Sequence, residues 1–303
     1  MHNRPMASQT TFKANLLLLT VASIWGLSFV AQKAGMEHVG PLTFNGARAL
    51  LGTLTLVPLL LLRRTRARIE PRKLAVQGLF LGWVLFGGSA LMQVGIQYTT
   101  AGKAGFITGL YVVLVPVFGM MLGRAASRNV WFGVVCAIAG LYLLSVSDGI
   151  RPGRGDLLVL GGAVFWAMHM LLIDRFVRET DTVILSFAQF AVCTVLSWLA
   201  ALMFETIRWQ EIREAWITIT YAGVMTIGVA LTLQAYAQRE AHPSHAAIIL
   251  CLEGAIAALA GWLILGEILS QRMLAGCALI VAGMLASQWS TIRQIKRKRE
   301  RNS

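Results

Sequence analysis

Long apolar stretches alternate with short polar breaks along almost the whole chain. Ten stretches can be counted, each close to the roughly 20 residues that a helix needs to cross a membrane. Backbone polar groups in lipid must be hydrogen-bonded within the segment, so we expect every stretch to be a helix. The predicted helices cover about 15–34, 42–62, 74–97, 104–122 and 130–147 in the first half, and about 156–176, 183–203, 216–238, 245–265 and 273–291 in the second.

The second five predicted helices repeat features of the first five. At an offset of 141 residues, Trp25 corresponds to Trp166 and Gln93 to Gln234. A duplicated unit with an odd number of helices enters the membrane in the opposite sense. We therefore predict an all-α membrane protein of ten transmembrane helices, built as two inverted five-helix repeats over 15–147 and 156–291. Inverted repeats are typical of secondary transporters, whose binding site lies near the membrane midplane where the repeats meet.

The composition excludes most other classes of protein. Only 14% of residues are charged, against about 25% in soluble domains, so a water-soluble enzyme is excluded. The four cysteines lie inside apolar stretches without CxxC spacing or a neighbouring histidine, which predicts neither a metal site nor a disulfide framework. No GxxxxGK[ST], HExxH or GxSxG motif occurs, so ATP hydrolysis and the corresponding enzymes are not expected. We expect no cofactor.

Basic residues predict the orientation of the chain. The formal net charge of +13 would suggest a nucleic-acid partner in a soluble protein, but here the positive-inside rule accounts for it. With the N-terminus inside, 19 Lys and Arg fall on the cytoplasmic side and 7 on the other. We therefore expect no nucleic-acid partner, and a multi-pass protein of the bacterial cytoplasmic (inner) membrane with cytoplasmic tails at 1–14 and 292–303. The first apolar stretch is expected to be retained as a helix rather than cleaved as a signal peptide.

Three ionisable residues fall well inside predicted helices, where charge is costly: Arg48, His169 and Glu253. Arg48 either contacts a substrate or a gate, or it extends to the headgroups or a structural ion partner. Glu253 either provides a counter-charge for a substrate amine or a proton site, or it is a protonated side chain bonded across a helix interface. His169 either carries a proton or is a hydrogen-bonded packing residue.

Polar and aromatic side chains also recur at helical spacing. Trp25, Ser28 and Gln32 fall at i, i+3 and i+7 of the first helix, and Trp166 with His169 repeats the i, i+3 spacing in the sixth. Each set therefore shares one helical face, which we expect to point inward.

Glutamines form i, i+4 pairs in the third helix (Gln93 and Gln97) and in the eighth (Gln234 and Gln238). Such amides either line a cavity or join neighbouring helices. Their occurrence in both halves favours a central cavity. Further candidates for its lining are Thr108, Tyr111 and Tyr236.

Five segments carry a resemblance to a known family. They read IWGLSFVAQKAG in the first helix, PLTFNGARALL in the second, QYTTAGKAGFITGLYVVLVPVFG across the third and fourth, CLEGAIAALAGWLILGE in the ninth and GCALIVAGMLAS in the tenth. The chain from about residue 14 to 290 resembles the ten-helix EamA family of the drug/metabolite transporter superfamily. The family usually has a proline where Gly254 stands, and either residue loosens a helix, so we expect a local break there.

The leading hypothesis is a secondary transporter that exports a small amphipathic metabolite, amino acid or drug by alternating access. The expected partners are a small-molecule substrate and the lipid bilayer, with protons as one option for coupling and facilitated diffusion as the other. A membrane-embedded enzyme and a membrane scaffold without a cavity remain the alternatives. The predicted substrate-binding residues are Trp25, Ser28, Gln32, Arg48, Gln93, Thr108, Tyr111, Trp166, His169, Gln234, Tyr236 and Glu253.

Overall fold

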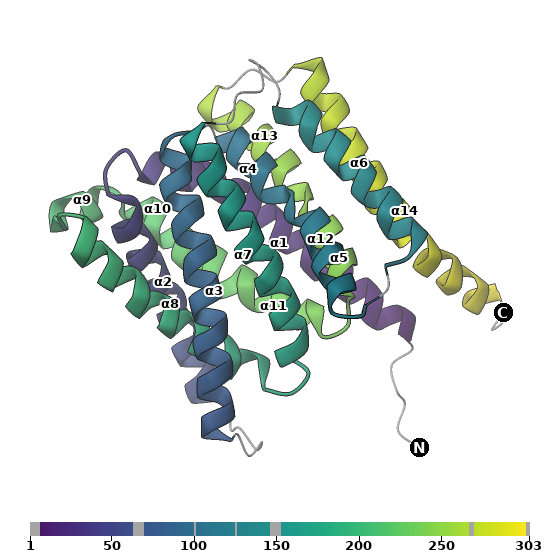
Figure 1. Ribbon diagram of the computed structural model, residues 1–303, viewed down its shortest axis with the longest axis horizontal. Coiled ribbons are helices and arrows are strands. Elements are labelled where there is room, and N and C mark those ends of the chain that lie inside the picture. Colours follow the sequence, from purple (N-terminus) through teal and green to yellow (C-terminus); the bar gives the residue numbers. More distant parts are fainter. Residues whose placement is uncertain are drawn as a thin grey trace.

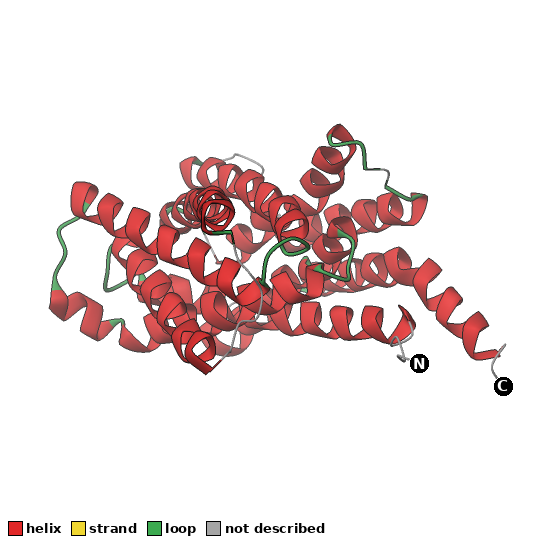
Figure 2. Ribbon diagram, turned by 90° about the horizontal axis from the view of Figure 1, so that it is seen from below, coloured by secondary structure: helices red, strands yellow, loops and turns green. Residues whose placement is uncertain are grey.

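A computed structural model of the protein describes residues 7–62, 70–99, 101–124, 126–145, 153–266 and 270–300. Within these ranges every regular element is a helix (Figures 1 and 2). The elements of the first half are α1 (Ala7–Gly35), α2 (Pro41–Leu62), α3 (Pro71–Gln97), α4 (Ala101–Gly109), α5 (Tyr111–Met121) and α6 (Arg128–Ser145). Those of the second are α7 (Arg154–Phe176), α8 (Thr182–Phe204), α9 (Trp209–Glu214), α10 (Trp216–Thr220), η1 (Tyr221–Leu231), α11 (Thr232–Gln238), α12 (Pro243–Leu250), α13 (Leu252–Leu265) and α14 (Gln271–Glu300).

Apolar length makes this a multi-pass membrane protein. Eight helical segments in the described chain are long and apolar enough to span a membrane. Within an apolar 18-residue stretch of each segment, 44–72% of the residues are buried inside the protein. Two shorter apolar helices, Arg128–Leu143 and Gln271–Ala286, belong to α6 and α14. All ten predicted apolar stretches therefore lie in helices.

Two helix ends differ from the sequence prediction. The first helix begins at Ala7 rather than near residue 15, and the last continues to Glu300 instead of ending near residue 291. Helical propensity explains this, because Lys, Arg, Gln and Glu are good helix formers outside the membrane too. Apolarity marks where a helix meets lipid, and not where its hydrogen bonds end.

Three predicted helices are interrupted. The fourth breaks at Leu110, between α4 and α5, and the ninth breaks at Cys251, between α12 and α13. The two breaks are 141 residues apart and touch, since the Cys251 thiol donates to the Gly109 carbonyl at 3.4 Å. The break expected at Gly254 is therefore present three residues earlier. In the eighth helix, the eleven residues of η1 are wound as a π-helix.

The helices α6 and α14 pack along each other at one edge of the molecule (Figure 1). Glycines bring the two backbones together. A Cβ on Gly140 would lie 2.6 Å from the Gly276 carbonyl, and one on Gly283 would lie 2.8 Å from the Gly133 carbonyl. The largest cluster of buried apolar side chains contains residues of both these helices together with α1, α5, α7, α12 and α13.

Candidate substrate cavity

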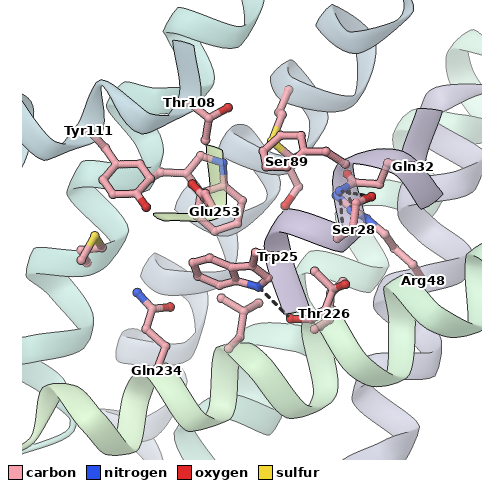
Figure 3. A pocket seen from close by; sticks show the side chains of 16 residues that line it. Trp25, Ser28, Gln32, Arg48, Ser89, Thr108, Tyr111, Thr226, Gln234 and Glu253 are labelled. Carbon is pink, nitrogen blue, oxygen red and sulfur yellow. Dashed lines mark hydrogen bonds between the residues drawn. The ribbon is translucent and has the colours of Figure 1, made fainter. Parts of the chain in front are cut away.

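A cavity lies where α1, α7 and the interrupted helices meet (Figure 3). Its volume is about 50 Å³, counted as the space open to the centre of a water-sized sphere, which is enough for a few waters. A metabolite would therefore enter only after side chains or helices move apart. Nine of the twelve predicted site residues line the cavity: Trp25, Ser28, Gln32, Arg48, Thr108, Tyr111, Trp166, Gln234 and Glu253.

Two indole rings from equivalent positions of α1 and α7 form part of the wall. The ring centroids of Trp25 and Trp166 are 6.1 Å apart, in a tilted arrangement. The indole N–H of Trp25 donates to the Thr226 carbonyl in η1 at 3.2 Å, while the indole N–H of Trp166 has no acceptor among the described residues. Both rings present apolar faces with a polar edge, a combination suited to an amphipathic ligand.

Arg48 is buried, with only 2% of its surface exposed. Its guanidinium donates to Gln32 Oε1 at 2.6 Å and to Asn45 Oδ1 at 3.0 and 2.8 Å, and it lies over the Phe44 ring at 5.8 Å. No carboxylate lies within ion-pair distance of it in the part of the chain that the structure describes. Apart from substrate or gate contact, the sequence left two structural roles open for Arg48, extension to the headgroups and a structural ion pair. Extension to the headgroups does not match this burial.

Glu253 opens the first turn of α13, immediately after the break at Cys251, and is also 2% exposed. No basic side chain of the described residues pairs with it, and its Oε1 has no hydrogen-bond partner there. The hydroxyl of Thr108 is likewise unpaired, whereas the hydroxyl of Tyr111 interacts with the Glu253 carboxylate. Figure 3 shows Tyr111 and Glu253 at the same side of the cavity. Buried polar atoms without partners are unusual in folded proteins, so this cluster is suited to a ligand or water.

Further polar atoms of the wall lack partners as well. Both amide atoms of Gln234 and the hydroxyl of Thr226 are buried and unpaired within the described chain. With Thr108, Tyr111 and Glu253 they make the cavity rich in donors and acceptors, although its walls are mostly apolar. A helical scaffold without a cavity would instead pair its polar side chains with each other.

Three predicted site residues do not line this cavity. His169 stands behind Trp166, in an edge-on contact of 5.9 Å between ring centroids, and its Nε2 is 2.7 Å from Gln189 Oε1. Gln93 is fully buried in α3, and Tyr236 is half-buried in α11. The geometry of His169 matches the packing alternative at Nε2, which faces Gln189, whereas its buried Nδ1 has no partner among the described residues.

Seven lining residues were not singled out from the sequence: Phe29, Ser89, Met92, Met170, Thr226, Ile227 and Leu231. Most are apolar residues within apolar helices, so nothing in the sequence pattern separates them from residues that face lipid or core. Ser89 and Met92 fall at i−4 and i−1 of Gln93, so the polar stripe of Ser89 and Gln93 could have marked the face of this helix that points to the cavity. In η1, the set of residues that share one face follows its π-helical winding and not the α-helical spacing.

Charged residues cluster around the C-terminal end of α7. Asp174 is buried and accepts from Arg124 at 2.6 Å and from Arg178 at 2.9 Å. Beside it, His242 caps α12, because its Nδ1 accepts from the Ser244 amide at 3.3 Å. Burial lowers the pKa of His242 below its usual value; the Asp174 charge opposes this shift, and Arg124 and Arg178 add to it. Burial, more than the neighbouring charges, therefore favours the neutral form of His242.

The described residues contain no group of three or more His, Cys, Asp and Glu side chains that could hold a metal ion. Comparison with known proteins settles the family. The model of the EamA-like transporter family matches twice, over residues 12–146 and 153–287. The chain is a member of the EamA-like transporter family.

Similar proteins agree with this assignment. An uncharacterized transporter of Archaeoglobus fulgidus is 31% identical over 274 residues, covering 90% of this chain and 84% of that protein. The uncharacterized transporter YoaV of Bacillus subtilis is 23% identical, with 93% and 99% covered, and the uncharacterized inner membrane transporter YedA of Escherichia coli is 22% identical, with 84% and 83% covered. A crystal structure of another protein matches 96% of this EamA chain and 99% of its own, with a TM-score of 0.74 at 20% identity, which shows a shared fold.

Proposed function

We propose that this EamA-family protein is a secondary transporter that exports a small amphipathic metabolite, amino acid or drug by alternating access. The observation that carries the proposal is the cavity beside α1 and α7, in which aromatic rings, a buried cation, a buried acid and unpaired hydroxyls converge. Ligand sites combine mostly apolar walls with a few placed polar groups in this way. The small size of the cavity fits an occluded conformation.

The packing of the helices supports ten membrane helices in two inverted repeats. The helix α1 packs against η1 and α11, and its equivalent α7 packs against α3, the equivalent of η1 and α11. In the same way, α1 packs against α12 and α13, and α7 packs against their equivalents α4 and α5. The pair α3 and α8 has its counterpart in η1 and α2. These contacts between the halves thus have equivalents at the 141-residue offset. Interrupted helices at the meeting point of two repeats are a recurrent feature of transporter sites.

The proposed location is the bacterial cytoplasmic membrane, with both termini in the cytoplasm. The start of α1 and the end of α14 lie at the same end of the molecule (Figures 1 and 2). The excess of basic residues on that side supports its cytoplasmic assignment. Protons are one option for the coupling ion, since Glu253 is a protonatable group on the cavity wall.

The test is transport by the purified protein in proteoliposomes. Labelled amino acids, nucleosides and cationic drugs are loaded on one side, and their movement is compared with that in liposomes without protein. We expect at least one class to cross in a saturable manner that depends on Glu253. A membrane scaffold or an enzyme would leave the flux of the entire panel at the background of empty liposomes, and that result would refute the proposal.

A further inference from the structure

Arg48 is a permanent charge that the described part of the chain does not neutralise. All three of its side-chain hydrogen bonds go to the neutral amide oxygens of Gln32 and Asn45. A guanidinium stays charged at any physiological pH, and a buried charge is costly unless it is paired. The residue is 2% exposed and lines the cavity, so an anion that enters the cavity can reach it.

The two amides that contact Arg48 are themselves held in place. Gln32 Nε2 donates to Ser28 Oγ at 2.7 Å, and Asn45 Nδ2 donates to Ser197 Oγ at 2.8 Å, so both amide oxygens are directed at the guanidinium. The guanidinium has five N–H groups, of which three have acceptors. One N–H on each terminal nitrogen has no acceptor among the described residues.

Glu253 lines the same cavity but does not compensate Arg48. No ion pair joins the two side chains in the described part of the chain, and Figure 3 shows Glu253 above the Trp25 ring and Arg48 to the right of it. The cavity therefore carries one positive group, one negative group and an indole ring. A molecule that joins an anionic group to an apolar body matches this combination.

We infer that Arg48 receives the carboxylate of the transported molecule, and that Asn45 is the positioning residue that orients its guanidinium. This inference rests on the proposed transport function and narrows its substrate class. Two free N–H groups on neighbouring nitrogens match the two oxygens of a carboxylate, the arrangement that arginine favours. A single positive charge, with Glu253 in the same cavity, matches a singly charged carboxylate better than a doubly charged phosphate. An amine on the same molecule would face Glu253.

Binding to the purified protein in nanodiscs tests the inference by calorimetry. Two matched series share an apolar body and differ only in charged groups: phenylalanine, 3-phenylpropanoate, phenylphosphate and phenethylamine, and leucine, 4-methylpentanoate and isopentylamine. We expect the carboxylate members of at least one series to bind at least tenfold more tightly than its amine-only member. Equal or tighter binding of the amine-only member or of phenylphosphate, or no binding by either series, would overturn the inference.

A near-isosteric variant separates recognition from folding. Asn45→Asp supplies Arg48 with an internal carboxylate, and the Ser197 hydroxyl can donate to it. We expect an unchanged or raised melting temperature together with at least tenfold weaker carboxylate binding, a combination that a merely structural role would not give. Thr53→Val, which removes a buried hydroxyl of the same helix outside the cavity, is the control and should retain binding.

Retention of carboxylate affinity in Asn45→Asp would overturn the assignment of Arg48. The binding tests and the flux assay test different claims, so either one can give a negative result without the other. Transport of a substrate without a carboxylate would contradict this inference alone, whereas background flux for all compounds would contradict the proposed function.

Discussion

At the scale of single residues, the side chains around the cavity differ in how far the sequence could assign them. Ionisable residues were identifiable because charge is costly in an apolar helix, and Arg48 and Glu253 do line the cavity. His169 satisfied the same criterion but packs against Gln189, since charge cost does not show which way a side chain points. Asn45, which orients Arg48, was not found, because a small amide near a helix start has many structural uses.

Glu253→Gln tests the acid of the cavity. The amide keeps the shape and the hydrogen-bonding capacity of the side chain and removes its charge, so we expect normal membrane insertion and an unchanged melting temperature. Transport should fall at least tenfold, measured as initial flux in proteoliposomes. A wild-type flux between pH 5 and 8 would mean that the carboxylate is structural.

Single cysteines at positions 28 and 169 distinguish cavity from packing. In a background without Cys136, Cys193, Cys251 and Cys277, we expect Ser28→Cys to react with a small water-soluble thiol reagent, because this position lines the cavity. His169→Cys should react at least tenfold more slowly, since this position faces Trp166 and Gln189. Labelling followed by mass spectrometry measures both rates. Equal rates would contradict the placement of His169 off the wall.

At the scale of elements, helix existence was predictable and helix interruption was not. Ten apolar stretches give helices because lipid permits little else, and this physical constraint operates along the whole stretch. The breaks at Leu110 and Cys251 involve ordinary apolar residues, and the resemblance pointed only to the neighbourhood of Gly254. The π-helical winding of η1, which packs against α1 and α2, has no signal in the local sequence pattern.

The cap of α12 should make stability depend on pH. The pKa of His242 is lowered in the folded protein, so its neutral form contributes stability that is complete above the ordinary value near 6.5 and is lost as pH falls through the lowered value. The groups facing it are Asp174, Arg124, Arg178 and His245. We expect His242→Asn, which retains a capping side chain, to show a smaller loss of melting temperature between pH 7 and 5 than the wild type. Parallel curves would exclude His242 as the source.

The contact between α6 and α14 should tolerate no side chain at its centre. A Cβ at Gly140 would overlap the Gly276 carbonyl, so Gly140→Ala should destabilise the protein by about 1–3 kcal/mol, seen as a lower midpoint in denaturant unfolding. Gly119→Ala is the control, because a Cβ there meets only Arg124 Cβ, at 3.9 Å. Equal effects of the two substitutions would show that helix propensity rather than contact governs this position.

At the scale of the whole molecule, orientation in the membrane follows from charge rather than from fold. A reporter that is active only in the cytoplasm should be active when fused after Ser303 and inactive when inserted between α6 and α7. The reason is the count of 19 basic residues against 7 on the two sides. The reverse pattern of reporter activity would place the termini outside and would invert the proposed direction of transport.

The contact between Cys251 and the Gly109 carbonyl joins the two interrupted helices at the points where each is weakest. On the proposed inverted arrangement, a bend at one break acts directly on the other, so opening toward one side and closing toward the other become a single motion. A perfectly symmetric pair of repeats would have two end states of equal free energy. Any preference of this protein for the inward-facing or the outward-facing state must then come from equivalent positions that hold different residues in the two halves. Examples are Arg48, whose equivalent is Gln189, and Ser28, whose equivalent is His169. Exchanging the two residues of such a pair should shift the balance between the two states.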